Sequence, residues 1–413
     1  MTKHNIPPAL SWHDTQAFKN ISRFQALPNV QNICVTGGAG FIGSWFLRNM
    51  ALAYPQYNFI CFDIFDTCSS LNNLRALDEA SNFSIFHGNI CDAKAVRKCL
   101  VQHSVDAIVH FAAHSHVDLS FDSANTFCET NITGTVILLE AAREHGIKRF
   151  IHVSTDEVYG EVLPGGTDHK ETAPLHPTNP YSGSKAAADM MVCAFSKSFN
   201  LPVIIVRSNN VYGPNQFPEK IIPKFITLIL RGDKVPLYGN GSYTRRYVYA
   251  GDVAEAFNII LHKGEVGQTY NIGTYDEVSN IEIVEKIVRV ISATGYRYHH
   301  SATEFDLAQY VHFTLNRPFM DSAYGVDFSK LRILGWSPKT SFEDGLHRTV
   351  EWYRQFGEDW WGDISANLGA GEFKSHSPEN LLEASLPINM NSLRSSSSQV
   401  NGDYPETSKE DLS

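Results

Sequence analysis

The chain has 413 residues, of which 43% are hydrophobic and 19% charged, and its formal net charge is -10. This composition is typical of a folded globular protein, and the length is enough for two lobes with sizeable cores. The acidic balance excludes a general nucleic-acid binder and a basic protein of membrane surfaces, although a local positive site can still bind an anionic small substrate.

The cysteines indicate a reducing environment. Seven are present, at positions 34, 61, 68, 91, 99, 128 and 193, without C-x-x-C spacing. An odd, unpatterned set is typical of free thiols. No stretch reaches the apolar length of a membrane span, and residues 1–30 lack the apolar core of a signal peptide. The expected location is therefore the cytoplasm.

The first half of the chain alternates strands and helices. We expect residues 1–30 to be a loose N-terminal extension. Short apolar runs predict strands at 32–37, 58–64, 83–88, 107–113, 149–155 and 202–208, and helical patterns lie at 41–53, 93–103, 124–146 and 181–199. Apolar strands that alternate with helices indicate an α/β fold with a doubly wound parallel sheet of the Rossmann type, which we assign to residues 31–212.

The pattern changes after Tyr212. Apolar periodicity predicts helices in 221–232, 252–264 and 280–295, whereas 243–252 and 267–274 are typical of short strands or loops. We assign residues 213–366 mainly to a smaller, mixed C-terminal lobe. Residues 367–413 are rich in Ser, Asn, Glu and Pro, and we expect a disordered tail because they cannot bury enough apolar area to fold.

A glycine-rich turn follows the first predicted strand, in the stretch "ICVTGGAGFIGSWFL" (33–47). Gly38, Gly40 and Gly43 match the G-x-G-x-x-G pattern, and Gly37 extends it. Glycines let the backbone approach a pyrophosphate, and the N-terminus of the following helix favours its negative charge. Asp63 ends the next strand, where an acid that binds the ribose of NAD is expected and where the 2′-phosphate of NADP would be repelled. The alternative is an ordinary β–α turn.

Two further motifs carry groups suited to proton transfer. "HVSTDEVYGE" (152–161) follows an apolar strand with a hydroxyl and two adjacent carboxylates, at Thr155, Asp156 and Glu157. Where such a pair is poorly solvated, one carboxyl can hold a proton while the other does not; the alternative is a solvated turn. Tyr181 and Lys185 share one face of a predicted helix, and a nearby ammonium favours the phenolate that can act as a base.

Together these motifs resemble the extended short-chain dehydrogenase/reductase family and, within it, the nucleoside-diphosphate-glucose 4,6-dehydratases. The likeness runs from about Ile33 to Asp363 and depends on "VTGGAGFIGS", "HFAAHSHVDLSF", "STDEVYGE", "PTNPYSGSK", "TRRYVYAGDVAEAF", "YNIGT" and "NRPF". Epimerases and decarboxylases of this family usually carry small hydroxyl residues at the Asp-Glu position. "SNNVYGPNQFPEKIIPKF" and "EWYRQFGEDWWGD" are especially similar to the UDP-glucose 4,6-dehydratase half of plant rhamnose synthases and to fungal relatives, which favours UDP-glucose over dTDP-glucose.

The resemblance implies an internal redox reaction with NAD. Tyr181, assisted by Lys185, would take the proton of the C4 hydroxyl as hydride leaves C4, and Thr155 would hold the C4 oxygen. Glu157 would remove the C5 proton, and Asp156, kept protonated, would protonate the departing C6 hydroxyl. Return of the hydride to C6 would give a 4-keto-6-deoxy sugar nucleotide.

The resemblance also implies that the lobe at 213–366 mainly binds the sugar nucleotide, and it implies the binding residues. Cofactor contacts are expected from Gly37, Gly40, Phe41, Ile42, Gly43, Asp63, Asn89, Ile90, Phe111, Ala112, Ala113, Thr130, Tyr181 and Lys185. Substrate contacts are expected from Ser115, Thr155, Asn210, Lys220, Arg245, Asn280 and Arg317. Arginine suits a pyrophosphate because its planar guanidinium donates several hydrogen bonds.

Two positions depart from the family pattern. Asn89 stands where an Asp usually contacts adenine, although its amide carbonyl can still accept from the adenine amino group. Met320 stands where His or Asn is usual, which weakens the expected polar hold on the nucleotide end. His110, His114, His116 and Asp118 lack established zinc spacing, and we expect no metal.

Several alternatives remain at this level. The chain could be a dTDP-glucose 4,6-dehydratase, a sugar-nucleotide 4-epimerase or decarboxylase, or a non-catalytic NAD-binding protein. By analogy with the family we expect a homodimer that pairs the helices at 124–146 and 181–199 with their copies. A separate 3,5-epimerase/4-reductase that uses the product is a further expected partner.

Overall fold

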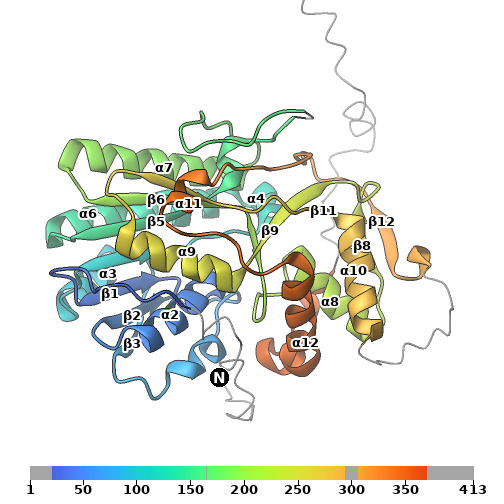
Figure 1. Ribbon diagram of the computed structural model, residues 1–413, viewed down its shortest axis with the longest axis horizontal. Helices are drawn as coiled ribbons and strands as arrows, with labels where there is room; N and C mark the ends of the chain where they lie inside the picture. Colours follow the sequence, from blue (N-terminus) through green and yellow to red (C-terminus); the bar gives the residue numbers. More distant parts are fainter. Residues whose placement is uncertain (1–20, 164, 294–305, 370–413) are drawn as a thin grey trace, which may run out of the picture. The chain divides into compact units, whose positions relative to one another are not determined.

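The computed structural model describes residues 21–163, 165–293 and 306–369 (Figure 1). The predicted extension at 1–30 is therefore described only from residue 21, and residues 370–413 of the predicted tail lie outside the described residues. The described residues belong to one compact unit. The division into two lobes at residue 212 stays a prediction.

Seven parallel strands form the main sheet, in the order β10-β6-β5-β4-β1-β2-β3. They are β1 (Asn32–Thr36), β2 (Asn58–Asp63), β3 (Phe83–His87), β4 (Ala107–His110), β5 (Arg149–Thr155), β6 (Val203–Ser208) and β10 (Thr269–Ile272). The first six confirm the predicted strands and the doubly wound α/β class. Because the order reverses between β1 and β4, a crevice is expected at the carboxyl ends of these two strands.

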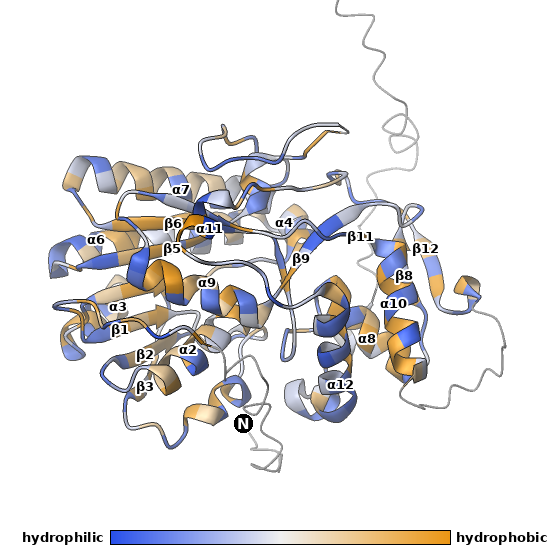
Figure 2. Ribbon diagram, in the orientation of Figure 1, coloured by the Kyte–Doolittle hydropathy of each residue, from blue (hydrophilic) through white to orange (hydrophobic). Residues whose placement is uncertain are grey.

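Helices cover both faces of this sheet (Figure 1). α2 (Phe41–Ala53) packs beside α9 (Ala250–Lys263), and α3 (Ala93–Gln102), α6 (Thr135–His145) and α7 (Pro180–Phe199) pack against the other face. Successive side chains of a strand point to opposite faces, so Val35 packs with the first group of helices and Cys34 with the second. Figure 2 shows the resulting apolar strands between helices that are hydrophobic on one side.

The predicted helix at 124–146 is interrupted. It consists of α5 (Ala124–Phe127), the π-helical segment η3 (Cys128–Gly134) and α6, and a short α4 (Val117–Asp122) precedes it. Asn131 of η3 donates to the carbonyl of His114 at 3.0 Å and accepts from the His114 amide at 2.8 Å. The widened turn therefore holds the segment after β4 in place, which is consistent with the frequent occurrence of such turns at functional sites.

Smaller sheets and further helices follow β6. β7 (Asn210–Tyr212), β9 (Thr244–Tyr249) and β11 (Glu277–Ser279) form one sheet, and β8 (Val235–Tyr238) pairs with β12 (Val311–Thr314). α8 (Ile221–Arg231), α10 (Asn280–Ala293) and α12 (Phe342–Trp361) pack on a common apolar core. The remaining short elements of the described chain are η2 (Leu71–Leu77) and η4 (Asp156–Tyr159), which precede β6, and η5 (Leu307–Gln309), α11 (Ser329–Ile333) and α13 (Ser365–Leu368), which follow it.

The chain returns to the main sheet after this excursion. The stretch 267–274, which the sequence left open as strand or loop, contains β10, and β10 pairs in parallel with β6 at the edge of the sheet. Residues beyond 212 thus complete the sheet and, through α9, cover one of its faces. None of the helices in the described ranges combines the length and apolarity needed to cross a bilayer.

Candidate active site

A cavity of about 560 Å³ lies at the carboxyl ends of the central strands. The residues that follow β1, β2, β4, β5 and β6 all contribute to its wall, which is the position expected for a ligand in a doubly wound sheet. Every site residue expected from the sequence lines this cavity: Gly37, Gly40, Phe41, Ile42, Gly43, Asp63, Asn89, Ile90, Phe111, Ala112, Ala113, Ser115, Thr130, Thr155, Asp156, Glu157, Tyr181, Lys185, Asn210, Lys220, Arg245, Asn280 and Arg317.

The glycine-rich turn is built so that only glycine fits. Gly37 has a φ of +67°, and a Cβ there would lie 2.6 Å from the Ala112 nitrogen. A Cβ at Gly43 would lie 2.3 Å from the Gly37 carbonyl oxygen. The turn therefore packs tightly against the segment after β4 and leads directly into the N-terminus of α2, which is a cradle suited to a dinucleotide pyrophosphate.

Asp63 anchors the same turn. Its carboxylate accepts hydrogen bonds from the amides of Ala39 at 2.9 Å and Phe65 at 2.8 Å. Burial raises the pKa of Asp63 in spite of these bonds. The side-chain carbonyl of Asn89, which also lines the cavity, accepts from the Cys91 amide at 2.8 Å, so one lone pair of this oxygen is already used within its own turn.

The two adjacent carboxyls lie in η4, directly after β5, and both are buried rather than solvated. Asp156 is 3% exposed and accepts hydrogen bonds from Asn209 at 2.7 Å and from the Thr155 hydroxyl at 3.2 Å. Burial, reinforced by the charge of Glu157, raises the pKa of Asp156 to about 7. Asp156 can therefore hold a proton near neutral pH.

Glu157 has a different environment. It is 8% exposed, and Asn179 donates to its carboxylate at 3.2 Å. Burial raises the pKa of Glu157, but the positive charge of Arg245 and the hydrogen bond from Asn179 oppose this effect. The surroundings thus stabilise the anion of Glu157 more than that of Asp156, as a division into one acid and one base requires.

Tyr181 and Lys185 are buried on α7 beside this pair. Lys185 donates to the Val153 carbonyl at 2.6 Å, and burial lowers its pKa to about 8. Burial and then the charge of Glu157 raise the pKa of Tyr181 above its ordinary value, although the hydrogen bond with Thr155 opposes them. These effects together favour the protonated phenol.

The positively charged side chains that we expect to bind the substrate are paired with other groups of the protein. Arg317 forms an ion pair with Asp118, and Lys220 lies 3.7 Å from Glu219 and donates to the Ser115 carbonyl. The guanidinium of Arg245 stacks 4.6 Å from the ring centre of Tyr324. These contacts hold the positive groups along the cavity wall.

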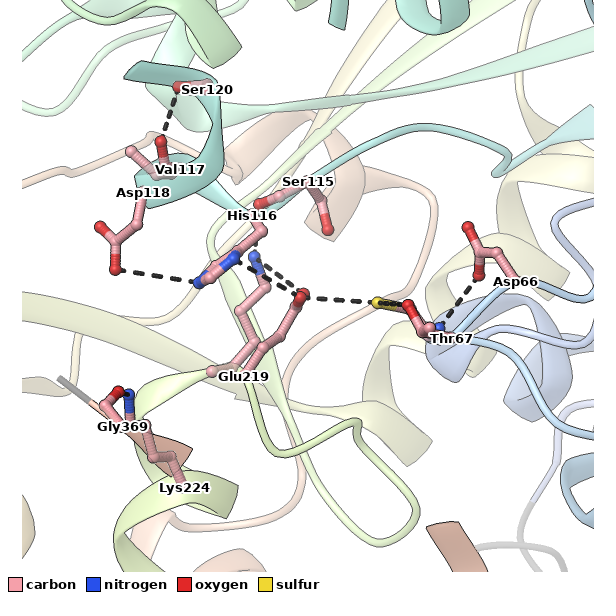
Figure 3. Close-up of polar contacts among 12 residues, drawn as sticks. Asp66, Thr67, Ser115, His116, Val117, Asp118, Ser120, Glu219, Lys224 and Gly369 are labelled. Carbon is pink, nitrogen blue, oxygen red and sulfur yellow. Dashed lines mark hydrogen bonds and ion pairs between the residues drawn. The ribbon is translucent and has the colours of Figure 1, made fainter. Parts of the chain in front are cut away.

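Sequence reasoning did not assign Glu219 or Cys68 to this wall. Figure 3 shows Glu219 and Asp118 on either side of His116. Each carboxylate has an oxygen 3.8 Å from a ring nitrogen of His116. The Cys68 thiol donates to Glu219 at 3.5 Å. Glu219 could have been noticed as the neighbour of Lys220, whereas the contact with Cys68 joins segments 151 residues apart and has no local signal.

Met320, which stands where the family usually has His or Asn, also lines the cavity. The next residue, Asp321, is buried and accepts from the Thr178 hydroxyl at 2.7 Å and from Tyr324. Within the described ranges, no three His, Cys, Asp or Glu side chains are grouped as metal ligands would be. Independence from metal stays a prediction.

Comparison with known proteins agrees with this geometry. Residues 34–349 match the family model described as GDP-mannose 4,6 dehydratase. The chain is 46% identical over 340 residues to a trifunctional UDP-glucose 4,6-dehydratase/3,5-epimerase/reductase of Arabidopsis thaliana, which covers 82% of this chain and 49% of the plant protein. It is 42% identical to the dTDP-D-glucose 4,6-dehydratase of Mus musculus, over 80% of this chain and 90% of the mouse protein.

A solved structure is similar over the same region. The dTDP-glucose 4,6-dehydratase DesIV of Streptomyces venezuelae, solved with NAD and TYD bound, is 39% identical with a TM-score of 0.74, over 80% of this chain and 99% of that one. The chain spans about half the length of the plant relative that it matches. The family match, the identities and the cavity agree, and the chain belongs to the nucleotide-sugar 4,6-dehydratases of the extended short-chain dehydrogenase/reductase family.

Proposed function

We propose that this chain is an NAD-dependent hydro-lyase that converts UDP-glucose to UDP-4-keto-6-deoxyglucose and water. The observation that carries the proposal is the buried Asp156–Glu157 pair beside Tyr181, since removal of water from C6 needs an acid and a base that epimerisation does not. The 46% identity with the plant UDP-glucose enzyme supports UDP-glucose, and the mouse and Streptomyces relatives make dTDP-glucose the second candidate.

NAD fits the glycine-rich cradle. Gly37, Gly40 and Gly43 would admit the pyrophosphate, and Asp63 would bind the adenosine ribose. Asn89, Ile90 and Thr130 would contact the adenine side, and the segment 111–113 the nicotinamide side. When bound, NAD supplies an acceptor for the hydride of C4 and a donor of hydride to C6. The phenol of Tyr181, whose pKa is raised by burial, would become a usable base beside the positive charge of the bound cofactor.

The roles of the catalytic residues follow from their environments. Tyr181 would remove the proton of the C4 hydroxyl, and Thr155 would orient the C4 oxygen. Oxidation at C4 makes the C5 proton acidic, and Glu157, whose anion is favoured by Arg245 and Asn179, would remove it. Asp156, with a pKa raised to about 7, would give its proton to the departing C6 hydroxyl. The cations Lys220, Arg245 and Arg317 would hold the diphosphate, with Ser115, Asn210 and Asn280 completing the substrate site.

Incubation with UDP-glucose and, separately, with dTDP-glucose tests the function. We expect a product lighter than UDP-glucose by one water, with faster turnover of UDP-glucose than of dTDP-glucose, measured by mass spectrometry. A product of unchanged mass would indicate an epimerase. Faster turnover of dTDP-glucose would reject the nucleotide assignment alone, and no product from either sugar would reject the activity.

Replacing Asp63 tests the cofactor site. We expect Asp63→Asn to weaken NAD binding by about tenfold, or about 1.4 kcal/mol, because a charged acceptor for the ribose is lost. Titration calorimetry on protein stripped of cofactor measures the affinity. Asp306→Asn is the matched control, since Asp306 caps η5, does not line the cavity and should leave NAD affinity unchanged. Equal affinities of the Asp63 variant and the unaltered chain would contradict the assignment.

The amide variants Asp156→Asn and Glu157→Gln separate oxidation from elimination. We expect each to lower turnover by a hundredfold or more, the order expected for loss of a general acid or base, while NADH accumulates because C4 is still oxidised. Tyr181→Phe is the contrast, since it should block NADH formation as well. Because Asp156 must be protonated to act, turnover of the unaltered chain should fall as the pH rises through about 7. Turnover at the unaltered rate in either amide variant would contradict the assignment of Asp156 as the acid and Glu157 as the base.

The assembly and location are also proposals. A homodimer through α7 and the α5–η3–α6 segment is supported by apolar side chains that α7 leaves exposed, with Met190 60% exposed. Sedimentation velocity should show a dimer, and Met190→Lys should convert it to a monomer. Ile333→Lys on α11 is the control, because Ile333 is 84% exposed and lies outside the proposed interface. A monomeric unaltered chain would reject the dimer. All seven cysteines are free thiols, which supports the cytoplasm. A separate 3,5-epimerase/4-reductase that uses the product stays a prediction.

A further inference from the structure

A buried charged cluster lies behind the catalytic helix, and the reaction described above does not use it. Asp189 of α7, His152 of β5 and Arg207 of β6 are 1%, 0% and 5% exposed. Arg207 Nε lies 2.9 Å from one carboxylate oxygen of Asp189, and His152 Nε2 lies 3.3 Å from the other. Buried charges are costly unless paired, so a cluster at this depth calls for a physical explanation.

The cluster is adjacent to Lys185. Asp189 follows Lys185 by one helical turn on α7, and residues with this spacing are neighbours on one face of a helix. The ammonium of Lys185 donates to the carbonyl of Val153, which is next to His152 on β5, and Arg207 lies opposite Ser154 in the β5–β6 register. The same three elements thus hold both the lysine and the charge cluster.

Asp189 is held as an anion. Burial alone would raise its pKa, but the polar contact with His152 at 3.3 Å and the charge of Arg207 outweigh this effect, and the pKa of Asp189 lies below the ordinary value. No residue in the described ranges donates a well-formed hydrogen bond to its Oδ1. Arg207 also donates to the Tyr159 hydroxyl at 2.9 Å, which in turn donates to Asn271 at 2.8 Å, so the cation is fixed in place.

The other groups around Lys185 do not supply this charge. His110 of β4 and His152 of β5 both face it, and burial lowers the pKa of each, so both are neutral at pH 7. Burial also lowers the pKa of Lys185 itself to about 8, and the negative charge of Asp189 opposes this. Cys193, one turn beyond Asp189, has its pKa raised by burial and stays a neutral thiol.

We propose that Asp189 is a positioning residue that keeps Lys185 in its ammonium form, and that Arg207 and His152 hold Asp189 for this task. The inference rests on the proposed roles of Tyr181 and Lys185. Asp189 does not line the cavity, and we assign its role to the charge it places near Lys185; the same charge also raises the pKa of Tyr181, as a smaller effect than burial. A salt bridge that served the fold alone would not change how the first hydride step depends on pH.

The test measures NADH formation against pH after rapid mixing with whichever sugar nucleotide the chain turns over. It is done in the Asp156→Asn background, which removes the titration of Asp156 and lets NADH accumulate. The rate should fall above about pH 8, where Lys185 loses its proton. Asp189→Asn removes the charge that favours the ammonium. We therefore expect the pH at which the rate falls to be lower by about one unit in this variant. The rate of NADH formation at about pH 8 should drop several-fold, whereas the rate at about pH 6 should stay similar.

Three companion variants complete the design. Asp189→Glu keeps the charge and should restore the unaltered profile. Asp252→Asn is the matched control, because Asp252 is also a buried carboxylate, 8% exposed, but caps the amides of Lys339 and Thr340 outside the cavity. If Asp189→Asn does not fold, Asp189→Asn with Arg207→Met removes the ion pair as a unit, leaves no unpaired charge, and should give the same downward shift.

The outcomes are distinguishable. An unchanged pH profile in a folded Asp189 variant overturns the inference, as does a shift that Asp252→Asn reproduces. If neither the single nor the double variant folds, the pair serves the fold and the positioning role is rejected. Lys185→Met tests the underlying roles separately: if it forms NADH at the unaltered rate, the proposed site itself is wrong, whereas an inactive Lys185→Met with an unshifted Asp189→Asn rejects the inference alone.

Discussion

Burial of two adjacent carboxyls at the end of β5 is the constraint on which the site depends. A shift in the pKa of Asp156 to about 7 means that its ionised form costs about 4 kcal/mol more in the folded chain than in water. A penalty of this size is a large part of the net stability of an ordinary domain, so the surrounding core must be extensive. The Asn209 amide, the Thr155 hydroxyl and the guanidinium of Arg245 moderate this penalty without removing it.

The N-terminus of α7 connects this constraint to the fold. Asn179 caps the helix by accepting from the Ser182 amide at 2.8 Å, and its amide group donates to Glu157. One side chain therefore fixes both the start of the helix that carries Tyr181 and the position of the adjacent base. Pro180 at the first helical position strengthens the same boundary. The local rules of helix capping and the geometry of the site are satisfied together.

Much of this could be read from the sequence, because buried parallel strands give apolar runs and because the Gly-rich, Asp-Glu and Tyr/Lys motifs are local. Other features could not. β7 and β11 have three residues each, too few for a periodic signal, and the π-helical turn at η3 depends on Asn131 meeting the segment after β4. The contacts of Glu219 with Cys68 and His116 join distant segments, and the burial of Asp156 is set by tertiary packing that no local pattern encodes.

The position of β10 has a consequence for how the chain matures. The strand that covers the open edge of β6 begins at Thr269, whereas β6 ends at Ser208, so about sixty residues must leave the ribosome before that edge is closed. During this interval a nascent chain would present an unpaired apolar strand, a known template for association with other chains. Pairings so far apart in sequence also slow folding. Chaperone demand during synthesis should therefore peak between these two strands.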